Sequence, residues 1–261
     1  MSDYLGSIWR CRYFWLALVK NDLRTRYRRS VLGMGWSLLH PIAMTAVLTV
    51  VFTQLFGQDP KTYAPMVLAG LACWNYIRTV TIQGCQCLFQ GEPYIRQYPA
   101  PLAIYPLRTA LGEMVHFIIA LFLVLALSWF FNGFANLHTL ACLVPTIVLL
   151  FVLGWSLAVL AGFANVHFQD TQHLCEVGFQ ILFYATPVMY TDEFLQKTSL
   201  GWLLYYNPLR AFLKLVREPI LEGGNLPTFT ILSVASMTAL LACAAASLVL
   251  LRCQRRLIFH L

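Results

Sequence analysis

Long apolar runs dominate the chain, and six of them have the length of a membrane-crossing helix. Such a helix needs about 20 mostly apolar residues, because each residue advances about 1.5 Å and the hydrocarbon core is about 30 Å thick. The pattern therefore predicts an all-α membrane protein with one transmembrane domain over residues 1–261. The six predicted spans cover residues 36–56, 63–88, 108–131, 140–164, 172–190 and 229–251.

The segment before the first span has an amphipathic pattern. In residues 10–34, apolar residues recur at spacings of three or four, and Lys20, Arg24 and Arg28 occupy another side. A helix of this kind lies in the plane of the membrane, with its apolar stripe in the acyl boundary and its basic side chains toward anionic headgroups. We therefore expect an N-terminal interface helix that contacts membrane lipids.

Two further segments are punctuated by prolines. In residues 92–106, Pro93 takes the first position of a short predicted helix, which the prolines that follow bring to an end. Residues 191–228 mix charges with proline and glycine, and their apolar piece is too short and too polar to span a membrane. There, Asn207 and Pro208 supply the backbone break that a re-entrant turn needs.

Composition and charge agree with a membrane location. The chain is 59% hydrophobic and 11% charged, whereas an average soluble domain is about one quarter charged. The formal net charge is +7, but the long apolar segments leave no polar surface for a nucleic-acid partner. Most arginines fall on one side of the predicted spans, which places both termini in the cytoplasm. We expect no cleavable signal peptide, because Arg10 and Arg12 lead into an amphipathic segment.

Neither a metal centre nor an enzyme site is predicted. The eight cysteines form no CxxC pair and are typical of small buried hydrophobic residues. Glu113 with His116, and His167 with Asp170 and His173, do not offer three or four convergent ligands. An integral membrane enzyme, such as a glycolipid-modifying transferase, would use Glu113, His116 and Asp170. These residues are dispersed along the chain, so no catalytic residue is predicted.

Five short motifs occur in order along the chain. They are D-L-R-x-R-Y-R-x-S-V-L-G-x-x-W-x-L-L-x-P (22–41), I-R-x-Y-x-x-P (95–101), F-x-D-x-x-H (168–173), T-P-V-M-Y (186–190) and Y-N-P-L (206–209). Together they resemble the signatures of type-2 ABC exporter permeases, specifically those that export polysaccharides and teichoic acids. The resemblance covers essentially the whole chain.

The resemblance implies a homodimeric permease that docks two copies of an ABC ATPase subunit. It also implies an undecaprenyl-linked polysaccharide substrate, such as O-antigen, capsule or a teichoic-acid-like glycan, moved across the bacterial inner membrane. The chain contains no G-x-x-x-x-G-K-[ST] phosphate loop. We therefore expect no cofactor on this chain, with ATP and Mg bound by the partner. A type-2 ABC exporter of drugs or small lipids stays open as an alternative.

Contact with the ATPase is expected on the cytoplasmic face. A stiff rod bracketed by prolines transmits displacement, so residues 92–98 are expected to insert into a groove of the ATPase. The helix at 22–29 and the loop at 168–173 would flank this rod. The coupling candidates are Asp22, Arg26, Glu92, Tyr94, Ile95, Arg96, Tyr98 and Asp170. A rigid turn without any partner is the competing interpretation.

Aromatic residues in the first, second and fifth spans are the candidates for the transport path, because the resemblance places these spans near the pore. Aromatic faces suit the C–H faces of sugars and let a chain slide without deep binding. The channel candidates are Phe52, Trp74, Tyr76, Arg78, Phe179, Phe183 and Tyr184. The competing interpretation for each aromatic residue is a place in the lipid-facing surface or in an interface belt.

Arg78 is a charge inside an apolar span, and such charges usually face a cavity or a partner. One hypothesis is that its guanidinium receives the pyrophosphate of the lipid-linked glycan, because this planar group matches phosphate oxygens. The alternative is that Arg78 snorkels to the interface or pairs with Glu113 or Glu176. The resemblance implies that the re-entrant part before the last span is the extracellular gate, and Asn207 and Pro208 are the gate candidates.

Overall fold

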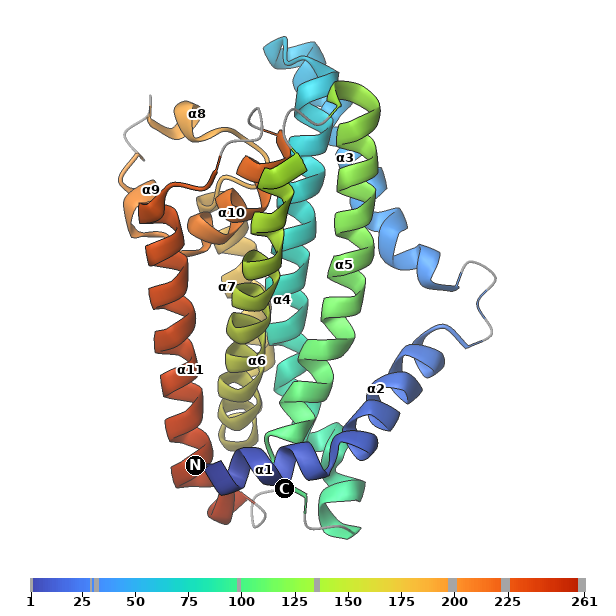
Figure 1. The fold of residues 1–261 in the computed structure, drawn as a ribbon, viewed down its shortest axis with the longest axis vertical. Helices are drawn as coiled ribbons and strands as arrows, with labels where there is room; N and C mark the ends of the chain where they lie inside the picture. Colours follow the sequence, from blue (N-terminus) through green and yellow to red (C-terminus); the bar gives the residue numbers. More distant parts are fainter. Residues whose placement is uncertain are drawn as a thin grey trace.

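The computed structural model describes residues 2–28, 30, 33–97, 100–133, 137–196, 201–221 and 226–257. Within these ranges every regular element is helical, and the long helices stand side by side in one bundle (Figure 1). The elements are α1 (Ser2–Arg10), α2 (Arg12–Arg26), η1 (Gly33–Gly35), α3 (Trp36–Phe56), α4 (Pro60–Gln97), α5 (Ile104–Asn132), η2 (Leu137–Cys142), α6 (Leu143–His167), α7 (Thr171–Ala185), α8 (Asp192–Gln196), α9 (Leu203–Tyr206), α10 (Leu209–Leu221) and α11 (Phe229–Leu257).

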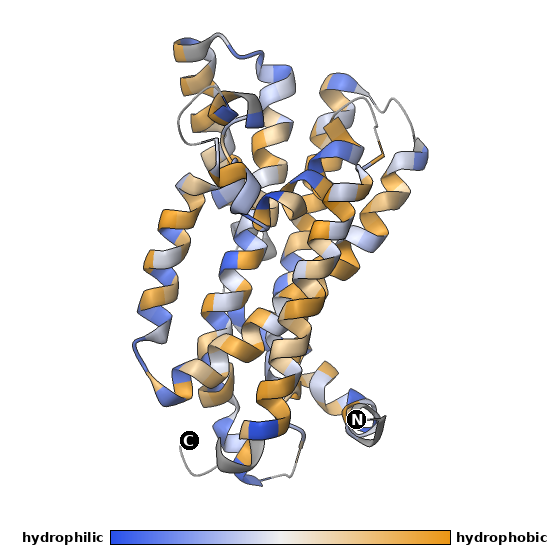
Figure 2. Ribbon diagram, turned by 90° about the vertical axis from the view of Figure 1, so that its left-hand side faces the viewer, coloured by the Kyte–Doolittle hydropathy of each residue, from blue (hydrophilic) through white to orange (hydrophobic). Residues whose placement is uncertain are grey.

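Helix α4 is the centre of the bundle. It contacts α3, α5, α6, α7 and α10, and it buries residues on all its sides, including Val67, Ile77 and Leu88. Hydrophobic residues dominate the long helices around it (Figure 2). A helix that is surrounded in this way needs small residues where its neighbours come close, because large side chains would hold the backbones apart.

Helices α4 and α6 approach each other closely. A Cβ atom on Gly84 would lie 2.6 Å from the Cα atom of Ala158. On the facing helix, a Cβ atom on Gly162 would lie 2.9 Å from the carbonyl oxygen of Gly84. The two backbones therefore touch directly, and neither glycine can gain a side chain without separating the helices.

Within the described ranges, four helices are long and apolar enough to cross a membrane. They provide the segments Leu38–Leu55, Ile104–Asn132, His138–His167 and Phe229–Cys253. Of the two other predicted spans, α4 is long enough but carries polar residues such as Asn75 and Arg78, and α7 has only 15 residues. Both lie within the same bundle (Figure 1). The all-helical prediction is confirmed, and four of its six spans meet the length and hydropathy of a membrane helix.

The predicted short helix beginning at Pro93 is wrong. Helix α4 runs without interruption to Gln97, with Pro93 inside it. A proline inside a helix removes one backbone hydrogen bond and crowds the carbonyl of the residue four positions earlier. Here the helix accommodates Pro93 and continues for four more residues. The next helix, α5, begins at Ile104 and not at the expected residue 108. The segment expected to couple to the ATPase is therefore, up to Gln97, the last part of the central helix.

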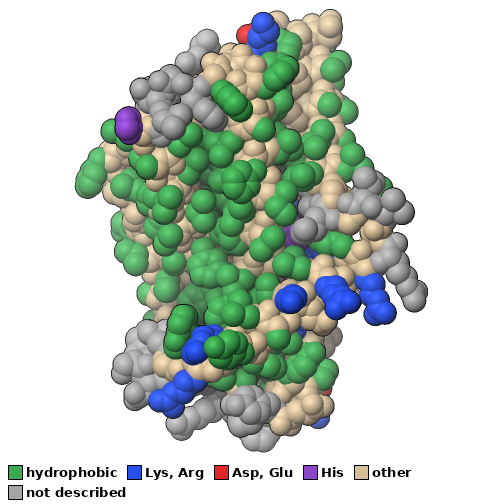
Figure 3. All heavy atoms as spheres, turned by 45° about the vertical axis from the view of Figure 1, so that its right-hand side comes forward, with side chains coloured by type: hydrophobic (Ala, Val, Ile, Leu, Met, Phe, Trp, Pro, Cys, Tyr) green, Lys and Arg blue, Asp and Glu red, His purple; other side chains and the backbone are tan. Residues whose placement is uncertain are grey.

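The predicted interface helix over residues 10–34 is also wrong in its bounds. The structure has two helices there, α1 and α2, separated at Cys11, and α2 ends at Arg26. Of the expected apolar stripe, Val19 is buried and Leu16 is exposed. The two helices lie across one end of the bundle, which we call the α1 end; the ends of α4 and α11 lie there too (Figure 1). Lys and Arg side chains gather along this end below a hydrophobic surface (Figure 3).

The contact between α4 and α6 predicts a large difference between two glycine substitutions. Gly84→Ala should lower the free energy of unfolding by about 1 to 3 kcal/mol, because the new methyl group overlaps the α6 backbone. Gly112→Ala on α5 is the matched control, since nothing lies within 4 Å of its added methyl group. It should be neutral or stabilising by up to about 1 kcal/mol. Thermal unfolding of the detergent-solubilised variants measures both, and equal midpoints would contradict the contact.

Candidate functional site

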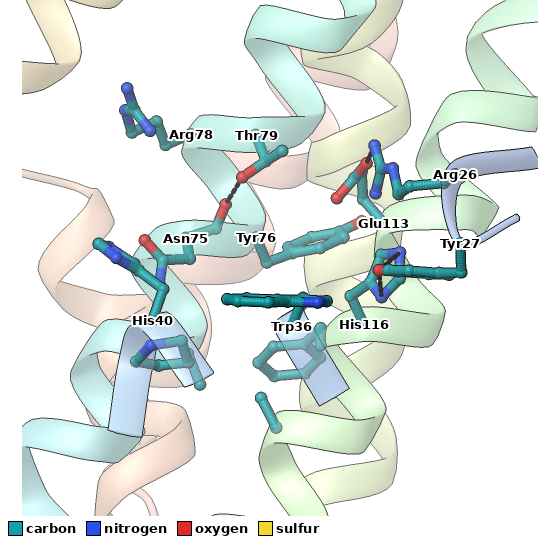
Figure 4. A pocket seen from close by; sticks show the side chains of 14 residues that line it. Arg26, Tyr27, Trp36, His40, Asn75, Tyr76, Arg78, Thr79, Glu113 and His116 are labelled. Carbon is teal, nitrogen blue, oxygen red and sulfur yellow. Dashed lines mark hydrogen bonds and ion pairs between the residues drawn. The ribbon is translucent and has the colours of Figure 1, made fainter. Parts of the chain in front are cut away.

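A polar cavity of about 360 Å³ opens between α4, α5, the end of α2 with Tyr27, and the first turns of α3. Figure 4 shows its walls, with Arg26, Tyr27 and His116 on one side and His40, Asn75 and Arg78 on the other. Polar side chains lining it also include Thr79 and Glu113, and its aromatic residues include Trp36 and Tyr76. A water-accessible space lined by two guanidinium groups and two imidazoles inside an apolar bundle is a candidate ligand site.

One wall of the polar cavity is a set of contacts that fixes α2 to α5. Arg26, the last residue of α2, donates to a carboxylate oxygen of Glu113 at 2.7 Å. The hydroxyl of Tyr27 lies 3.3 Å from the ring nitrogens of His116. Because the Glu113 side chain is only 8% exposed, it needs this cation close by. The charge of Glu113 in this wall is therefore paired with that of Arg26. The Arg26 side chain is nevertheless 40% exposed.

A second ion pair fixes α2 to α5 outside the polar cavity. Arg108 donates two hydrogen bonds to the two carboxylate oxygens of Asp22. Two ion pairs one helical turn apart on α2, at Asp22 and Arg26, thus dock the helix on α5. Both residues were expected to serve ATPase contact. Their charged groups are directed to α5, so any role in coupling would pass through the position of α2.

The Tyr76 side chain is directed toward Glu113, but its hydroxyl forms no hydrogen bond with the described residues. The ring is 3% exposed and points toward Glu113 (Figure 4), and the hydroxyl has no hydrogen bond within the described residues. Gly154 of α6 makes room for it, since a Cβ atom there would lie 2.3 Å from the hydroxyl oxygen. A buried hydroxyl without a hydrogen bond costs free energy. The Tyr76 hydroxyl is therefore a hydrogen-bond donor that the site does not yet use.

Arg78 lies where the polar cavity meets a second cavity. It lines both of them, its side chain is exposed, and it forms no hydrogen bond or ion pair with the described residues. The alternative pairing with Glu113 is wrong, because that carboxylate binds Arg26. Glu176 accepts a hydrogen bond from Gln172 at 3.1 Å, and the charge of Arg78 acts on it, but among the described residues Arg78 and Glu176 form no ion pair within 4 Å. The guanidinium of Arg78 is therefore available to a ligand.

The second cavity, about 230 Å³, is lined by aromatic residues from α4 and α7. Trp74 packs against Phe179 and Phe183 with ring centroids 5.7 Å apart in both pairs, and Phe183 lies 5.5 Å from Tyr184. Five of the channel candidates line this aromatic cavity: Trp74, Arg78, Phe179, Phe183 and Tyr184. Tyr76 belongs to the polar cavity. Phe52 lies elsewhere and stacks on Tyr63 at 5.2 Å.

The coupling candidates near residue 95 occupy the last turns of α4. Glu92 and Arg96 form an exposed ion pair at 2.7 Å, one helical turn apart. Tyr94 contacts Phe14 of α2 edge to face at 5.9 Å, and Ile95 is partly buried. Asp170 is exposed immediately before α7. Tyr98 lies outside the described residues.

The gate candidates lie at the end of the bundle opposite the α1 end. Asn207 donates to the hydroxyl of Thr186 at 2.6 Å, and its side-chain oxygen accepts from the backbone N–H of Leu209 at 3.0 Å. Pro208 lies between Asn207 and Leu209. The Asn207 side chain thus joins the segment after α7 to the start of α10. Asn207 and Pro208 therefore form an ordered turn.

Sequence reasoning missed a buried arginine next to these gate candidates. Arg217 of α10 is 8% exposed and donates to the backbone oxygens of Met66, Pro187 and Val188 at 3.2, 2.6 and 2.6 Å. Gly70 lies against it, since a Cβ atom there would be 2.2 Å from the guanidinium. The only sequence signal was a charge in an amphipathic segment, and this does not distinguish a buried charge from an exposed one.

A third cavity, about 540 Å³, opens at the same end beside Arg210, Lys214 and Asp192. Asp192 accepts from Arg210 at 2.6 Å and from Lys214 at 2.9 Å. Burial alone would raise the pKa of Asp192, but these two cations outweigh it and hold the pKa below its ordinary value. The short helix α8 is thereby fixed to α10 through charge.

Comparison with known proteins identifies the family of this chain. Residues 13–221 match the family of ABC-2 type transporters. The chain belongs to the ABC-2 type transporter family. The resemblance noted in the sequence is thus confirmed at the level of the family, and an ABC-2 chain of this kind is a membrane subunit of a transporter.

Individual relatives of this ABC-2 transporter chain are distant in sequence but similar in extent. An O-antigen export system permease protein of Myxococcus xanthus is 24% identical over 95% of both chains. One of Klebsiella pneumoniae is 20% identical over 80% of both. A polysialic acid transport protein of Escherichia coli is 21% identical, covering 79% of this chain and 81% of its own. The similarity extends over most of each protein.

The ion pairs of Asp192 predict an acid-sensitive stability. Because the folded-state pKa is lowered, the pairs stabilise the fold above the unfolded carboxyl pKa of about 4. This stabilisation is lost as the pH falls through the lower, folded-state value. Thermal midpoints of the purified protein should therefore fall in that window, and Asp192→Asn should remove this component of the pH dependence. An Asp192→Asn curve parallel to the wild-type curve would contradict the assignment.

Proposed function

We propose that this chain is the transmembrane subunit of an ATP-driven exporter of a lipid-linked polysaccharide. The observation that carries the proposal is the place of Arg78, which is available to a ligand where the polar cavity meets the aromatic cavity. A lipid-linked glycan has an anionic phosphate linkage next to a sugar chain. The two adjacent cavities offer these two parts different chemistry, and the named relatives export or transport such polymers.

In this proposal the polar cavity holds the anionic linkage. A guanidinium group is planar and offers forked donors that match the oxygens of a phosphate. Arg78 supplies such a group, and His40 and Asn75 stand beside it (Figure 4). The linkage would be a pyrophosphate on an undecaprenyl carrier, with the lipid tail left in the membrane.

The aromatic cavity is the proposed start of the sugar path. Tyr184 is 63% exposed and Phe183 is partly buried, so their rings can present a face to a passing sugar. Trp74 and Phe179 are at least 90% buried and support them from behind. In the same proposal α4 and α7 also cross the membrane, which gives six spans and places both termini in the cytoplasm of a bacterial inner membrane.

The energy source is proposed to be a separate ABC ATPase that binds ATP and Mg. Two copies would dock on a homodimer of this chain at the α1 end, where the last turns of α4 offer Glu92, Tyr94, Ile95 and Arg96. Tyr98, Asp22, Arg26 and Asp170 complete the proposed coupling set. Because those turns continue the central helix, a push on them is transmitted directly to the bundle core. Asn207 and Pro208 are the proposed gate at the opposite end.

The headgroup assignment predicts that Arg78→Gln loses export. Removing one guanidinium that binds a phosphate should lower export about tenfold or more, because a charge-assisted hydrogen bond is lost. Lys61→Gln is the matched control for folding and insertion, since it also removes one positive charge, and Lys61 is exposed and lines neither cavity. Surface polysaccharide is measured in cells that lack the native gene. Wild-type export by Arg78→Gln at equal membrane abundance would refute the assignment.

The coupling assignment predicts a different defect for Arg96→Ala. Export should fall several-fold while the co-purified ATPase still hydrolyses ATP, because the exposed end of α4 no longer transmits the movement. ATPase activity and export are measured on the same preparation. A proportional loss of both activities would indicate failed assembly, whereas normal export would remove Arg96 from the coupling set.

A further inference from the structure

Two cysteines that are far apart in the sequence lie in contact near the aromatic cavity. The thiols of Cys85 on α4 and Cys175 on α7 are hydrogen-bonded to each other, and neither forms a disulfide. Along α4, Cys85 lies between Trp74 and the α1 end. One turn after Cys175 on α7, Phe179 packs against Trp74 and lines the aromatic cavity. The thiol pair therefore lies just below this cavity, on the side of the α1 end.

A second polar contact joins the same two helices beside the thiols. Gln86, which follows Cys85, donates to the side-chain oxygen of Gln172 at 2.5 Å. Gln172 lies one turn before Cys175 on α7, so the amide contact and the thiol contact belong to one seam. Only Phe179 of the 15 residues of α7 is buried. The seam with α4 is therefore important for the position of α7 in the described bundle.

The two thiols differ in accessibility, and this gives them different roles in oxidation. Cys175 is partly exposed, whereas Cys85 is 0% exposed. A peroxide converts an accessible thiolate into a sulfenic acid, and a neighbouring thiol condenses with it to form a disulfide. Cys175 is therefore the thiol that meets the oxidant, and Cys85 is the thiol that resolves the sulfenic acid.

We propose that Cys85 and Cys175 form an oxidation site for hydrogen peroxide, and that their disulfide locks α7 to α4 and stops export. The sulfur of Cys175 attacks one peroxide oxygen, the O–O bond breaks, and the released hydroxide leaves as water with the Cys175 proton. The sulfur of Cys85 then attacks that of Cys175, the S–O bond breaks, and a second water leaves with the Cys85 proton. Two thiols thus lose two electrons to one peroxide, and a dithiol reductant reverses the reaction by thiol exchange.

The effect on export rests on the proposed function. The aromatic cavity of about 230 Å³ equals the share of about eight water molecules in the liquid, which is too small for a glycan chain to pass. Trp74 of α4 closes it by packing against Phe179 and Phe183 of α7. A sugar can pass between these rings only when α7 moves away from α4. A covalent bond between the two sulfur atoms, one helical turn from Phe179, prevents that movement.

Oxidation of the permease purified with its ATPase tests the site. The reduced complex is treated with hydrogen peroxide, the remaining thiols are blocked with N-ethylmaleimide, and linked peptides are identified by mass spectrometry. The expected product joins the peptides of Cys85 and Cys175, and dithiothreitol removes it. A Cys175 that is blocked or further oxidised, without a link to Cys85, would overturn the site. This measurement does not depend on export.

Glycan export by inverted membrane vesicles tests the lock. Peroxide should lower wild-type export several-fold and dithiothreitol should restore it, whereas Cys85→Ala and Cys175→Ala should keep their rates. Cys87→Ala is the matched control, because Cys87 is also buried on α4 but faces α6, where its sulfur would lie 3.0 Å from a Cβ atom on Gly162. It should stay as sensitive as the wild type. Oxidation of the ATPase would slow all these complexes alike.

The lock and the proposed function fail in different ways. A disulfide that forms without slowing export would overturn the lock, and so would full sensitivity of Cys85→Ala. If that variant does not assemble into a folded complex, Cys85→Ser replaces it, with the same expected resistance to peroxide. No glycan export by the reduced wild-type complex would overturn the proposed function and the lock with it, while the linked peptide would still decide the oxidation site.

Discussion

A charge among apolar helices must be compensated within a few ångströms, and this constraint decides where the elements of this protein are fixed. Glu113 holds the end of α2 through Arg26. Asp192 holds α8 to α10 through two cations, and Arg217 holds three backbone oxygens at the same end of the bundle. Arg78 differs from these three residues, because within the described part of the chain it forms no ion pair or hydrogen bond, and it lines both cavities of the candidate site.

The sequence was sufficient for the fold class but not for the internal boundaries. Apolar runs longer than a membrane thickness leave a helical bundle as the main solution, because backbone groups in lipid must be paired within the segment. The error at Pro93 has a local cause. A proline near a helix start and a proline in the last turns of a longer helix look alike in sequence, and only the packing of Gly91 against Tyr105 favours continuation.

Much of the candidate site was also accessible from sequence, since Trp74, Arg78, Phe179 and Phe183 do converge. They were chosen because the resemblance places their spans near the pore, and the spacing of four residues within each pair also puts its members on one face of α4 or α7. Partners on other helices were not visible. Neither the pairing of Arg26 with Glu113 nor the burial of Arg217 follows from any spacing, because both depend on the order in which helices pack.

The contact of Gly84 with Ala158 and Gly162 divides the bundle mechanically. Helices that touch through their backbones clash when they slide or tilt against each other. Helices α4 and α6 therefore form one rigid unit. Helix α3 has the opposite character, since only 11% of its apolar window is buried, against 50% for α6. Three of its threonines, Thr45, Thr49 and Thr53, also keep hydroxyls without partners in the described structure. Among the four described helices of membrane length, α3 is therefore the one that its neighbours in this chain hold least.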